Sequence, residues 1–294
     1  MKLEGIATFV AIVEAGSVSG AGRRLNLSKS VVSERLKELE RSLGASLIQR
    51  TTRRLAVTSE GNAFVERARR ILREAADARS DIAERGGSLA GPLRISAPVS
   101  FGTLHLGRAL YPFLLANPGI QLTLDLDDRF VDVAAGGYDA VIRHGKVADA
   151  RVIAKRIAAS PRHLVASPGY LKRHGAPRTV ADLERHAAIL YSNRDTDWRF
   201  KVGKDFVVVR PERYVLVNNG LIMRDAAVAG VGITLLPAFL TGPEIAKGAL
   251  RILDVGAAPE SADLFVAYPA ARASAKVRAM VEALRGLSFD SRST

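Results

Sequence analysis

Apolar side chains recur every three or four residues over most of the first 87 positions, and this spacing predicts amphipathic helices. The first apolar stripe consists of Leu3, Ile6, Phe9, Val10 and Val13. Gly16 is placed to end this helix, and Ser17 can cap a second, shorter one. The inner face of the second helix consists of Val18, Ala21 and Leu25.

A third helix is predicted after a tight turn at Asn26 and Leu27, and Gly44 is placed to end it. Its buried stripe consists of Val32, Leu36, Leu39 and Leu43. Two helices joined by a short turn form a helix-turn-helix arrangement. The candidate DNA-binding residues at the cap and on the outer face of the third helix are Ser28, Lys29, Ser30, Ser33, Glu34 and Lys37.

The residue types on this outer face suit a major groove. Lysine can donate to guanine, serine can bond to either base edge, and a carboxylate can accept from cytosine. A solvated helix face explains each single residue equally well, because the pattern specifies the face better than the role.

Two short strands are expected between residues 47 and 58, around a basic tip. The candidate DNA-binding residues of this hairpin are Arg50, Thr52, Arg53 and Arg54. A positively charged tip can lie along phosphates or enter a minor groove.

A long helix is expected over residues 59–85, with apolar side chains that alternate steps of four and three residues. The stripe consists of Phe64, Ala68, Ile71, Ala75, Ala78 and Ile82. This spacing is that of a heptad seam, and small alanines allow two helices to approach closely, so we predict dimerisation through this helix. The alternative is that the helix packs on its own domain. The glycine-rich residues that follow predict a hinge at 88–92.

From residue 93 the pattern changes to short apolar strands that alternate with helices. Strands are expected at residues 93–97, 122–126, 140–143, 164–166, 207–209 and 233–236, and helices at residues 104–116, 180–185, 221–229 and 275–287. This alternation predicts an α/β domain with helices on both faces of a sheet. Ligands in such domains bind beyond the carboxyl ends of strands, often at helix N-termini.

Composition narrows the classes of function. The chain has 294 residues, 48% of them hydrophobic and none of them cysteine, which excludes disulfides, thiolate metal sites and a cysteine nucleophile. The five histidines have no ligand-like spacing and no catalytic motif is present, so we expect neither an enzyme nor a metal or cofactor. Residues 226–243 form the longest uncharged run, but glycines and prolines interrupt it, and the N-terminus does not read as a signal peptide. We therefore expect a cytoplasmic protein without a membrane partner.

The formal net charge is +13, which favours polyanionic partners. Residues 1–87 contain 16 basic and 11 acidic side chains, a balance of +5, and the remaining residues carry +8. The N-terminal part is thus the more basic per residue.

Residues 9–61 resemble the DNA-binding end of LysR-type transcriptional regulators. The matching residues are Phe9, Val10, Gly16, Ser17, Ala21, Leu25, Ser28, Val32, Ser33, Leu39, Glu40, Leu43, Gly44, Leu47, Arg50, Thr58 and Gly61. Residues 141–145, 166–171, 230–233 and 236–237 resemble the effector domain of that family.

The resemblance implies an α/β fold with a mainly α-helical winged helix-turn-helix at 1–58, a dimerising linker helix at 59–87 and an effector-binding domain at 93–294. It also implies that this last domain has two lobes, as in periplasmic binding proteins. Lobe one would contain residues 93–161 and 267–288, and lobe two residues 162–266.

The chain departs from the usual family pattern at several positions. Lys29 stands where glutamine is usual, Ser30 where proline is frequent and Glu34 where a basic residue is frequent. Gly20 and Gly22 replace alanines, and each is expected to weaken the second helix by about 1 kcal/mol unless close packing requires it.

The candidate effector-binding residues are Ser100, Phe101, Gly102, Arg143, Asn218 and Asn219. Backbone donors and a hydroxyl at a helix N-terminus suit a carboxylate or another anion. Helix capping explains the serine and asparagines as well, and a structural ion pair explains Arg143. Trp198 and Phe200 could form an apolar wall of the site or simply pack in a core.

These observations predict a homodimeric or homotetrameric transcription regulator that binds double-stranded operator DNA. A small, anionic effector bound between the lobes would control it. The alternative is a cytoplasmic small-molecule-binding protein or an enzyme without a regulatory role at DNA.

Overall fold

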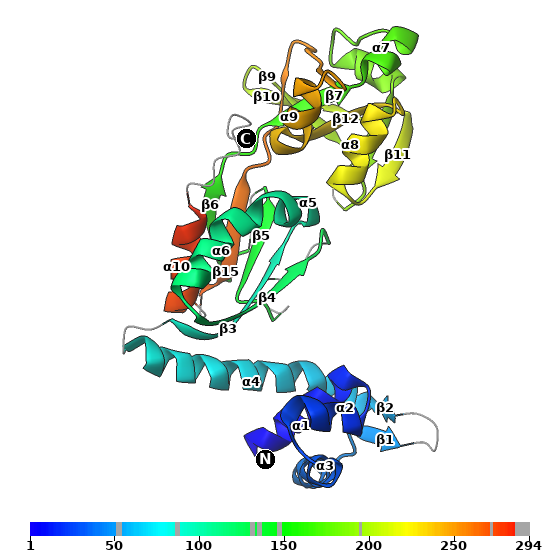
Figure 1. The fold of residues 1–294 in the computed structure, drawn as a ribbon. Coiled ribbons are helices and arrows are strands. Elements are labelled where there is room, and N and C mark those ends of the chain that lie inside the picture. The colour runs from blue at the N-terminus through cyan, green and yellow to red at the C-terminus, as the bar shows by residue number, and fades with distance from the viewer. Residues whose placement is uncertain are drawn as a thin grey trace. The chain divides into compact units, whose positions relative to one another are not determined.

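The computed structural model describes residues 1–50, 55–85, 89–129, 133, 137–145, 149–193, 196–270 and 273–285. The chain divides into two compact units, Met1–Gly91 and Pro92–Thr294. The first unit contains α1 (Leu3–Ala15), α2 (Val18–Leu25), α3 (Lys29–Leu43), β1 (Ile48–Arg50), β2 (Leu55–Val57) and α4 (Ser59–Arg85) (Figure 1).

The ends of the first three helices confirm the predicted caps. The Ser17 hydroxyl accepts from the Gly20 amide at 3.0 Å, and the Ser28 hydroxyl accepts from the Val31 amide at 3.3 Å. Gly16 and Gly44 end α1 and α3 with φ of +63° and +67°, which glycine adopts without strain.

The two unusual glycines of α2 are required by close packing. A Cβ on Gly22 would lie 2.7 Å from the Leu27 carbonyl oxygen, and one on Gly20 would lie 2.8 Å from the Ser17 hydroxyl. Alanine at position 22 would therefore collide with the turn after α2, and alanine at position 20 with the Ser17 cap.

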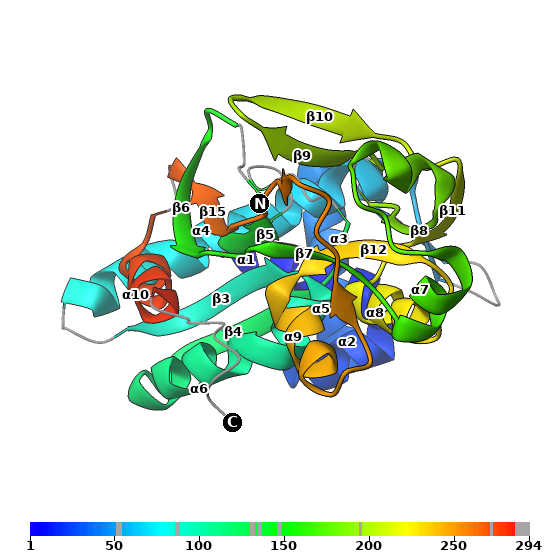
Figure 2. The same cartoon turned by 90° about the horizontal axis from the view of Figure 1, so that it is seen from above.

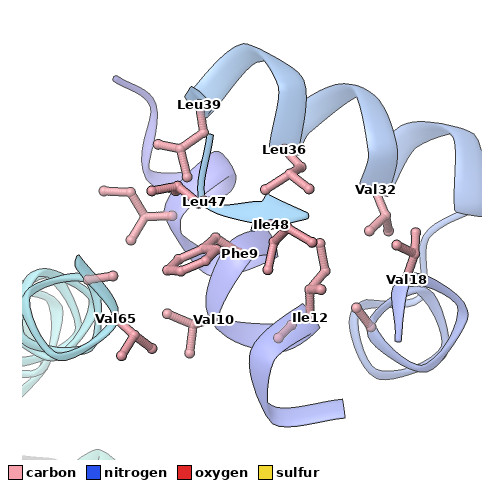
Figure 3. Close-up of a cluster of buried hydrophobic side chains, with 14 residues drawn as sticks. Phe9, Val10, Ile12, Val18, Val32, Leu36, Leu39, Leu47, Ile48 and Val65 are labelled. Carbon is pink, nitrogen blue, oxygen red and sulfur yellow. The ribbon is translucent and has the colours of Figure 1, made fainter. Parts of the chain in front are cut away.

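The predicted apolar stripes meet in one core (Figure 3). Phe9, Ile12 and Val32 are fully buried there. Leu43 was expected in this core but is 37% exposed, because it lies in the last turn of α3 beyond Leu39. Gly61 allows α4 to begin directly on β1, since a Cβ there would lie 2.2 Å from the Leu47 carbonyl oxygen.

The first sheet of the second unit has the order β4-β3-β5-β15-β6. Its strands are β3 (Ala90–Ala97), β4 (Gly119–Leu126), β5 (Ala140–His144), β6 (Val152–Ala158) and β15 (Leu264–Pro269). The boundary between the two units, after Gly91, falls within the expected hinge at 88–92, of which residues 90–92 already belong to β3; Gly91 has a φ of +94°.

The second sheet has the order β11-β8-β12-β7-β13. Its strands are β7 (Arg162–Ala166), β8 (Ala187–Tyr191), β11 (Arg213–Val217), β12 (Ile233–Pro237) and β13 (Arg251–Ile252). A smaller sheet contains β9 (Trp198–Val202), β10 (Asp205–Val209) and β14 (Ala258–Pro259). Trp198 and Phe200 are buried in the core of this part of the unit, so of the two interpretations the structure supports packing.

The helices of the second unit flank these sheets. They are α5 (Val99–Phe101), the π-helical η1 (Gly102–Leu106), α6 (Gly107–Ala116), α7 (Pro168–His174), the 3-10 helix η2 (Ala181–Arg185), α8 (Gly220–Val228), α9 (Ala238–Ala246) and α10 (Ala275–Leu284). The first three form one continuous helical run, α6 packs against α10, and α8 and α9 lie beside β12 (Figure 2). The last helix ends three residues earlier than expected, because Arg285 is extended.

Residues 159–161 connect β6 of the first sheet to β7 of the second, and residues 260–263 lead from β14 of the smaller sheet to β15 of the first. Asp263 fastens them together: its carboxylate accepts from the Ser160 amide at 3.1 Å and from Arg156 Nε at 2.6 Å. The Ala262 amide donates to the Ser160 carbonyl at 3.1 Å. Both connections are thus held at one point. In the described part of the chain, no single helix is long and apolar enough to cross a membrane; α1 and α2 pass that test only as a pair bent by 120°.

Candidate functional site

The start of α3 presents a polar surface. Lys29, Ser30, Glu34 and Lys37 are exposed, whereas Ser33 is half-buried. The Ser28 hydroxyl caps the helix and lies 2.8 Å from the Ser30 hydroxyl. The Ser28 side chain is therefore partly committed to the cap, and the exposed lysines and Glu34 are the more available groups.

The hairpin that follows α3 is formed by β1 and β2, which pair antiparallel with Ile48 opposite Val57 and Arg50 opposite Leu55. Thr52, Arg53 and Arg54 lie outside the described residues, as does the side chain of Arg50. Glu40 connects this hairpin to α3, because its Oε1 accepts from the Leu47 amide at 2.7 Å and from the Ile48 amide at 3.1 Å.

The predicted dimerisation seam of α4 divides into two parts. Phe64 packs against Phe9 with ring centroids 5.7 Å apart, and Ala68 is fully buried. These two residues belong to the core of their own unit, so their assignment to the seam is corrected: the apolar stripe continues the core of α1 into α4. Further along, Ile71 is 36% exposed, Ala75 is half-buried and Ala78 is exposed, while the side chain of Ile82 is not described.

A cavity of about 130 Å³ lies in the second unit, bounded by residues of both five-stranded sheets and by the starts of α5 and α8. Its polar lining residues include Ser100, Asp128, Arg143, His144, Arg162 and Tyr191, and its apolar ones include Met223, Leu235, Leu236, Phe239 and Leu240. The predicted residues Ser100 and Arg143 are thus brought together.

Ser100 is 6% exposed, and its Oγ has no hydrogen-bond partner among the described residues. It faces the start of α8, because a Cβ on Gly220 would lie 3.1 Å from Ser100 Oγ. A buried hydroxyl without a partner is costly, and a ligand group in the cavity would satisfy it.

The Arg143 guanidinium is held by oxygen atoms of uncharged groups. Its Nη1 donates to the Ile142 carbonyl at 2.7 Å and its Nη2 to Ser96 Oγ at 2.9 Å, while Nε is buried without a partner in the described part of the chain. None of the described carboxylates forms an ion pair with it, so the alternative of a structural ion pair is not what the structure contains. Burial lowers the pKa of Arg143.

Sequence reasoning missed Asp128. Its carboxylate accepts from the Val99 amide at 3.0 Å, at the start of α5, and is hydrogen-bonded to Tyr191. Burial raises the pKa of Asp128. The only available signal was an acidic residue two positions after a strand, which is a common pattern in loops.

Four predicted effector residues do not line the cavity. Phe101 is fully buried and lies edge-on to Phe239, and a Cβ on Gly102 would lie 2.2 Å from Leu126 Cδ2, so both serve packing. Asn219 caps α8, accepting from the Leu221 amide at 3.0 Å, and Asn218 is exposed. For Asn219 the capping alternative therefore fits better than ligand contact.

Comparison with known proteins assigns both units to one family. Residues 3–62 match the bacterial regulatory helix-turn-helix protein domain of the lysR family, and residues 86–288 match the LysR substrate binding domain. The chain belongs to the LysR family of transcriptional regulators. It is a DNA-binding regulator with an effector-binding domain, as the resemblance implied.

The relatives of this LysR-type regulator match over nearly the whole chain. The HTH-type transcriptional regulator PtxR of Pseudomonas aeruginosa is 34% identical, covering 97% of this chain and 92% of the relative. An HTH-type transcriptional regulator of Haemophilus influenzae is 32% identical, covering 91% and 94%. The full-length structure of AphB, a virulence activator of Vibrio cholerae, is 25% identical with a TM-score of 0.61 and covers 97% and 98%.

Proposed function

We propose that this LysR-type regulator reads its operator with the exposed start of α3 and the β1–β2 hairpin, and that a small anionic effector in the cavity of the second unit changes that binding. The single observation that supports effector control best is Ser100 Oγ, a buried hydroxyl without a described partner, in a cavity that also contains the Arg143 guanidinium.

The DNA part of the proposal rests on the exposure and chemistry of α3. Lys29 and Lys37 can donate to guanine or phosphate, and Glu34 can accept from cytosine. Glu40 holds the hairpin against the same helix, so the two basic elements keep a fixed spacing. Specific base readout needs such a rigid platform.

The assembly part of the proposal rests on the second half of α4. Ile71 and Ala78 are exposed there, on the stripe that Phe64 and Ala68 begin inside the core. Pairing of two such stripes would produce a homodimer, and pairing of dimers a homotetramer. Two-fold symmetry then predicts two operator half-sites separated by whole turns of DNA.

The proposed anionic character of the effector is supported by the half-buried Arg143. Its hydrogen bonds in the described part of the chain go to uncharged oxygen atoms, so a ligand that supplies a carboxylate or a similar group would give it a directly bonded anionic partner. The Ser100 hydroxyl can donate to that group as well.

Gel-shift titrations of the purified full-length protein against fragments of its source genome test the DNA part. We expect sequence-selective complexes that weaken steeply with salt. Uniform binding to every fragment, or none, would contradict the proposal. For the effector part, a thermal-shift screen of small organic anions should find compounds that raise the Tm, and Arg143→Gln should abolish the shift.

A further inference from the structure

The cavity that we assign to the effector contains a carboxylate as well as a cation. Asp128 and Arg143 both line it, and their charges influence each other electrostatically. Asp128 fixes the start of α5, but towards a bound simple anion its charge is unfavourable, since a carboxylate repels a second carboxylate.

Asp128 lies next to Ser100. Its Oδ1 accepts from the amide of Val99, the residue directly before Ser100, at 3.0 Å. The acidic group and the hydroxyl that lacks a partner are therefore positioned by the same first turn of helix. A ligand that reaches Ser100 also comes within reach of Asp128.

An ionised carboxylate accepts through about four lone-pair sites, and the Val99 amide and Tyr191 account for two. A donor on the ligand can use the remaining capacity. An ammonium group would also offset the charge of Asp128, and a hydroxyl would supply a neutral donor.

Part of the lining is apolar. Met223, Leu235 and Leu236 form it together with Phe239 and Leu240. The cavity volume of about 130 Å³ suits a small ligand. Such a ligand has room for one polar head and one short apolar tail.

Building on the proposed function, we propose that the effector is a small monocarboxylic acid that carries an ammonium or hydroxyl group beside its carboxylate, and an apolar side chain. The carboxylate pairs with Arg143 and Ser100, and the neighbouring donor binds Asp128. The apolar side chain packs on Met223 and Leu235. A dicarboxylate or a plain fatty acid is disfavoured, because it leaves the Asp128 carboxylate repelled or without its donor.

A matched set of probes tests this class by calorimetry on the full-length protein. With one isobutyl side chain the set is L-leucine, 2-hydroxy-4-methylpentanoate, 4-methylpentanoate and leucinamide, and the same four head groups are prepared with methyl and benzyl side chains. In at least one series we expect the amino or the hydroxy acid to bind about tenfold more tightly than both the plain acid and the amide. Tighter binding of the amino acid would identify an ammonium as the donor to Asp128, and tighter binding of the hydroxy acid would identify a hydroxyl.

Asp128→Asn sharpens the test, because its amide oxygen can still accept from the Val99 amide. For an amino acid ligand we expect affinity to fall about tenfold, since the ammonium loses its counter-charge; for a hydroxy acid the change should stay below about threefold. Asp182→Asn is the matched control, since Asp182 also accepts from backbone amides but lies in η2, and it should leave every affinity unchanged.

Equal binding of plain acids and their amino or hydroxy partners would overturn the ligand class, as would failure of the whole probe set to bind. The proposed function fails separately: it requires that some small anion bind in a manner abolished by Arg143→Gln. If another anion passes that test while the probe set fails, the cavity keeps its assignment and the amino or hydroxy acid class is wrong.

Discussion

The Tyr170 hydroxyl joins α7 to the start of β8 by a hydrogen bond to His186. Its oxygen accepts from the Ala187 amide at 3.0 Å and lies 3.1 Å from His186 Nδ1. Among the described residues the hydroxyl proton has no acceptor other than Nδ1. A neutral His186 that carries its own proton at Nε2 accepts the hydroxyl proton at Nδ1, whereas the protonated ring cannot.

This arrangement predicts that acid weakens the second unit. Burial, with a smaller contribution from His174, lowers the pKa of His186 below its ordinary value of 6.5. The folded state then binds fewer protons than the unfolded one, so the stabilisation is complete above pH 6.5 and is lost as the pH falls through the lowered pKa. We expect the urea midpoint to drop as the pH falls from about 7.5 to 5.5.

Burial lowers the pKa of His105 and His163 as well, so the wild-type slope alone does not isolate His186. His186→Gln keeps a polar side chain without a titrating group, and we expect it to flatten the pH dependence. An identical slope in the wild type and this variant would show that His186 does not contribute.

Gly61→Ala should destabilise the first unit. The new Cβ would lie 2.2 Å from the Leu47 carbonyl oxygen and 2.7 Å from Val57 Cγ1. Both contacts are too short, so the start of α4 would have to move away from the β1–β2 hairpin. We expect a loss of about 1–3 kcal/mol in urea unfolding of the full chain. Gly169→Ala is the matched control, because nothing lies within 4 Å of its Cβ position, and it should be neutral or stabilising by up to about 1 kcal/mol. Equal effects of the two substitutions would refute the steric argument.

Glu40 should matter more for its acceptor oxygen than for its charge. Glu40→Ala would leave the Leu47 and Ile48 amides without that acceptor, at a cost of about 1–3 kcal/mol, and would weaken DNA binding by loosening the hairpin. Glu40→Gln retains an acceptor and should lose less than half as much. Chemical denaturation and gel-shift affinity measure both effects. If the two variants lose equally, the carboxylate charge is what matters.

The helical first unit was largely predictable, because its determinants are local. Ser17, Ser28, Gly16 and Gly44 act on the turn next to them, and the apolar stripe of α1 is exposed only at its edges. The assignment of Phe64 and Ala68 to a dimer seam was wrong because these residues pack against α1, which is distant in the sequence. Periodicity shows that a helix face is covered but not whether the cover comes from the same chain.

The second unit was predictable in class but not in detail. Strands β8 and β11 went unrecognised, and in β11 the apolar residues 214–217 do not alternate with polar ones, although Tyr214 and Leu216 are exposed. Of the cavity, Ser100 and Arg143 were found because a helix start and a strand end are recognisable positions. Asp128 was missed because its role depends on a contact with Val99, 29 positions away in the chain.

Ser33 and Arg53 should affect DNA binding in different ways. Ser33 is half-buried on the helix that we expect in the major groove, so Ser33→Ala should change the preferred bases more than the overall affinity. Arg53 belongs to the predicted hairpin tip, where a phosphate contact gives no sequence information. Arg53→Ala should therefore weaken binding to all fragments alike and reduce the slope of log affinity against log salt by about one.

Selection from a randomised DNA pool, together with gel shifts at several salt concentrations, separates these two effects. Lys172→Ala is the charge-matched control, because Lys172 is exposed on α7 in the second unit, and it should change neither the preferred sequence nor the salt slope. If Ser33→Ala and Arg53→Ala alter preference and slope in the same way, the division between base contact by α3 and phosphate contact by the hairpin is wrong.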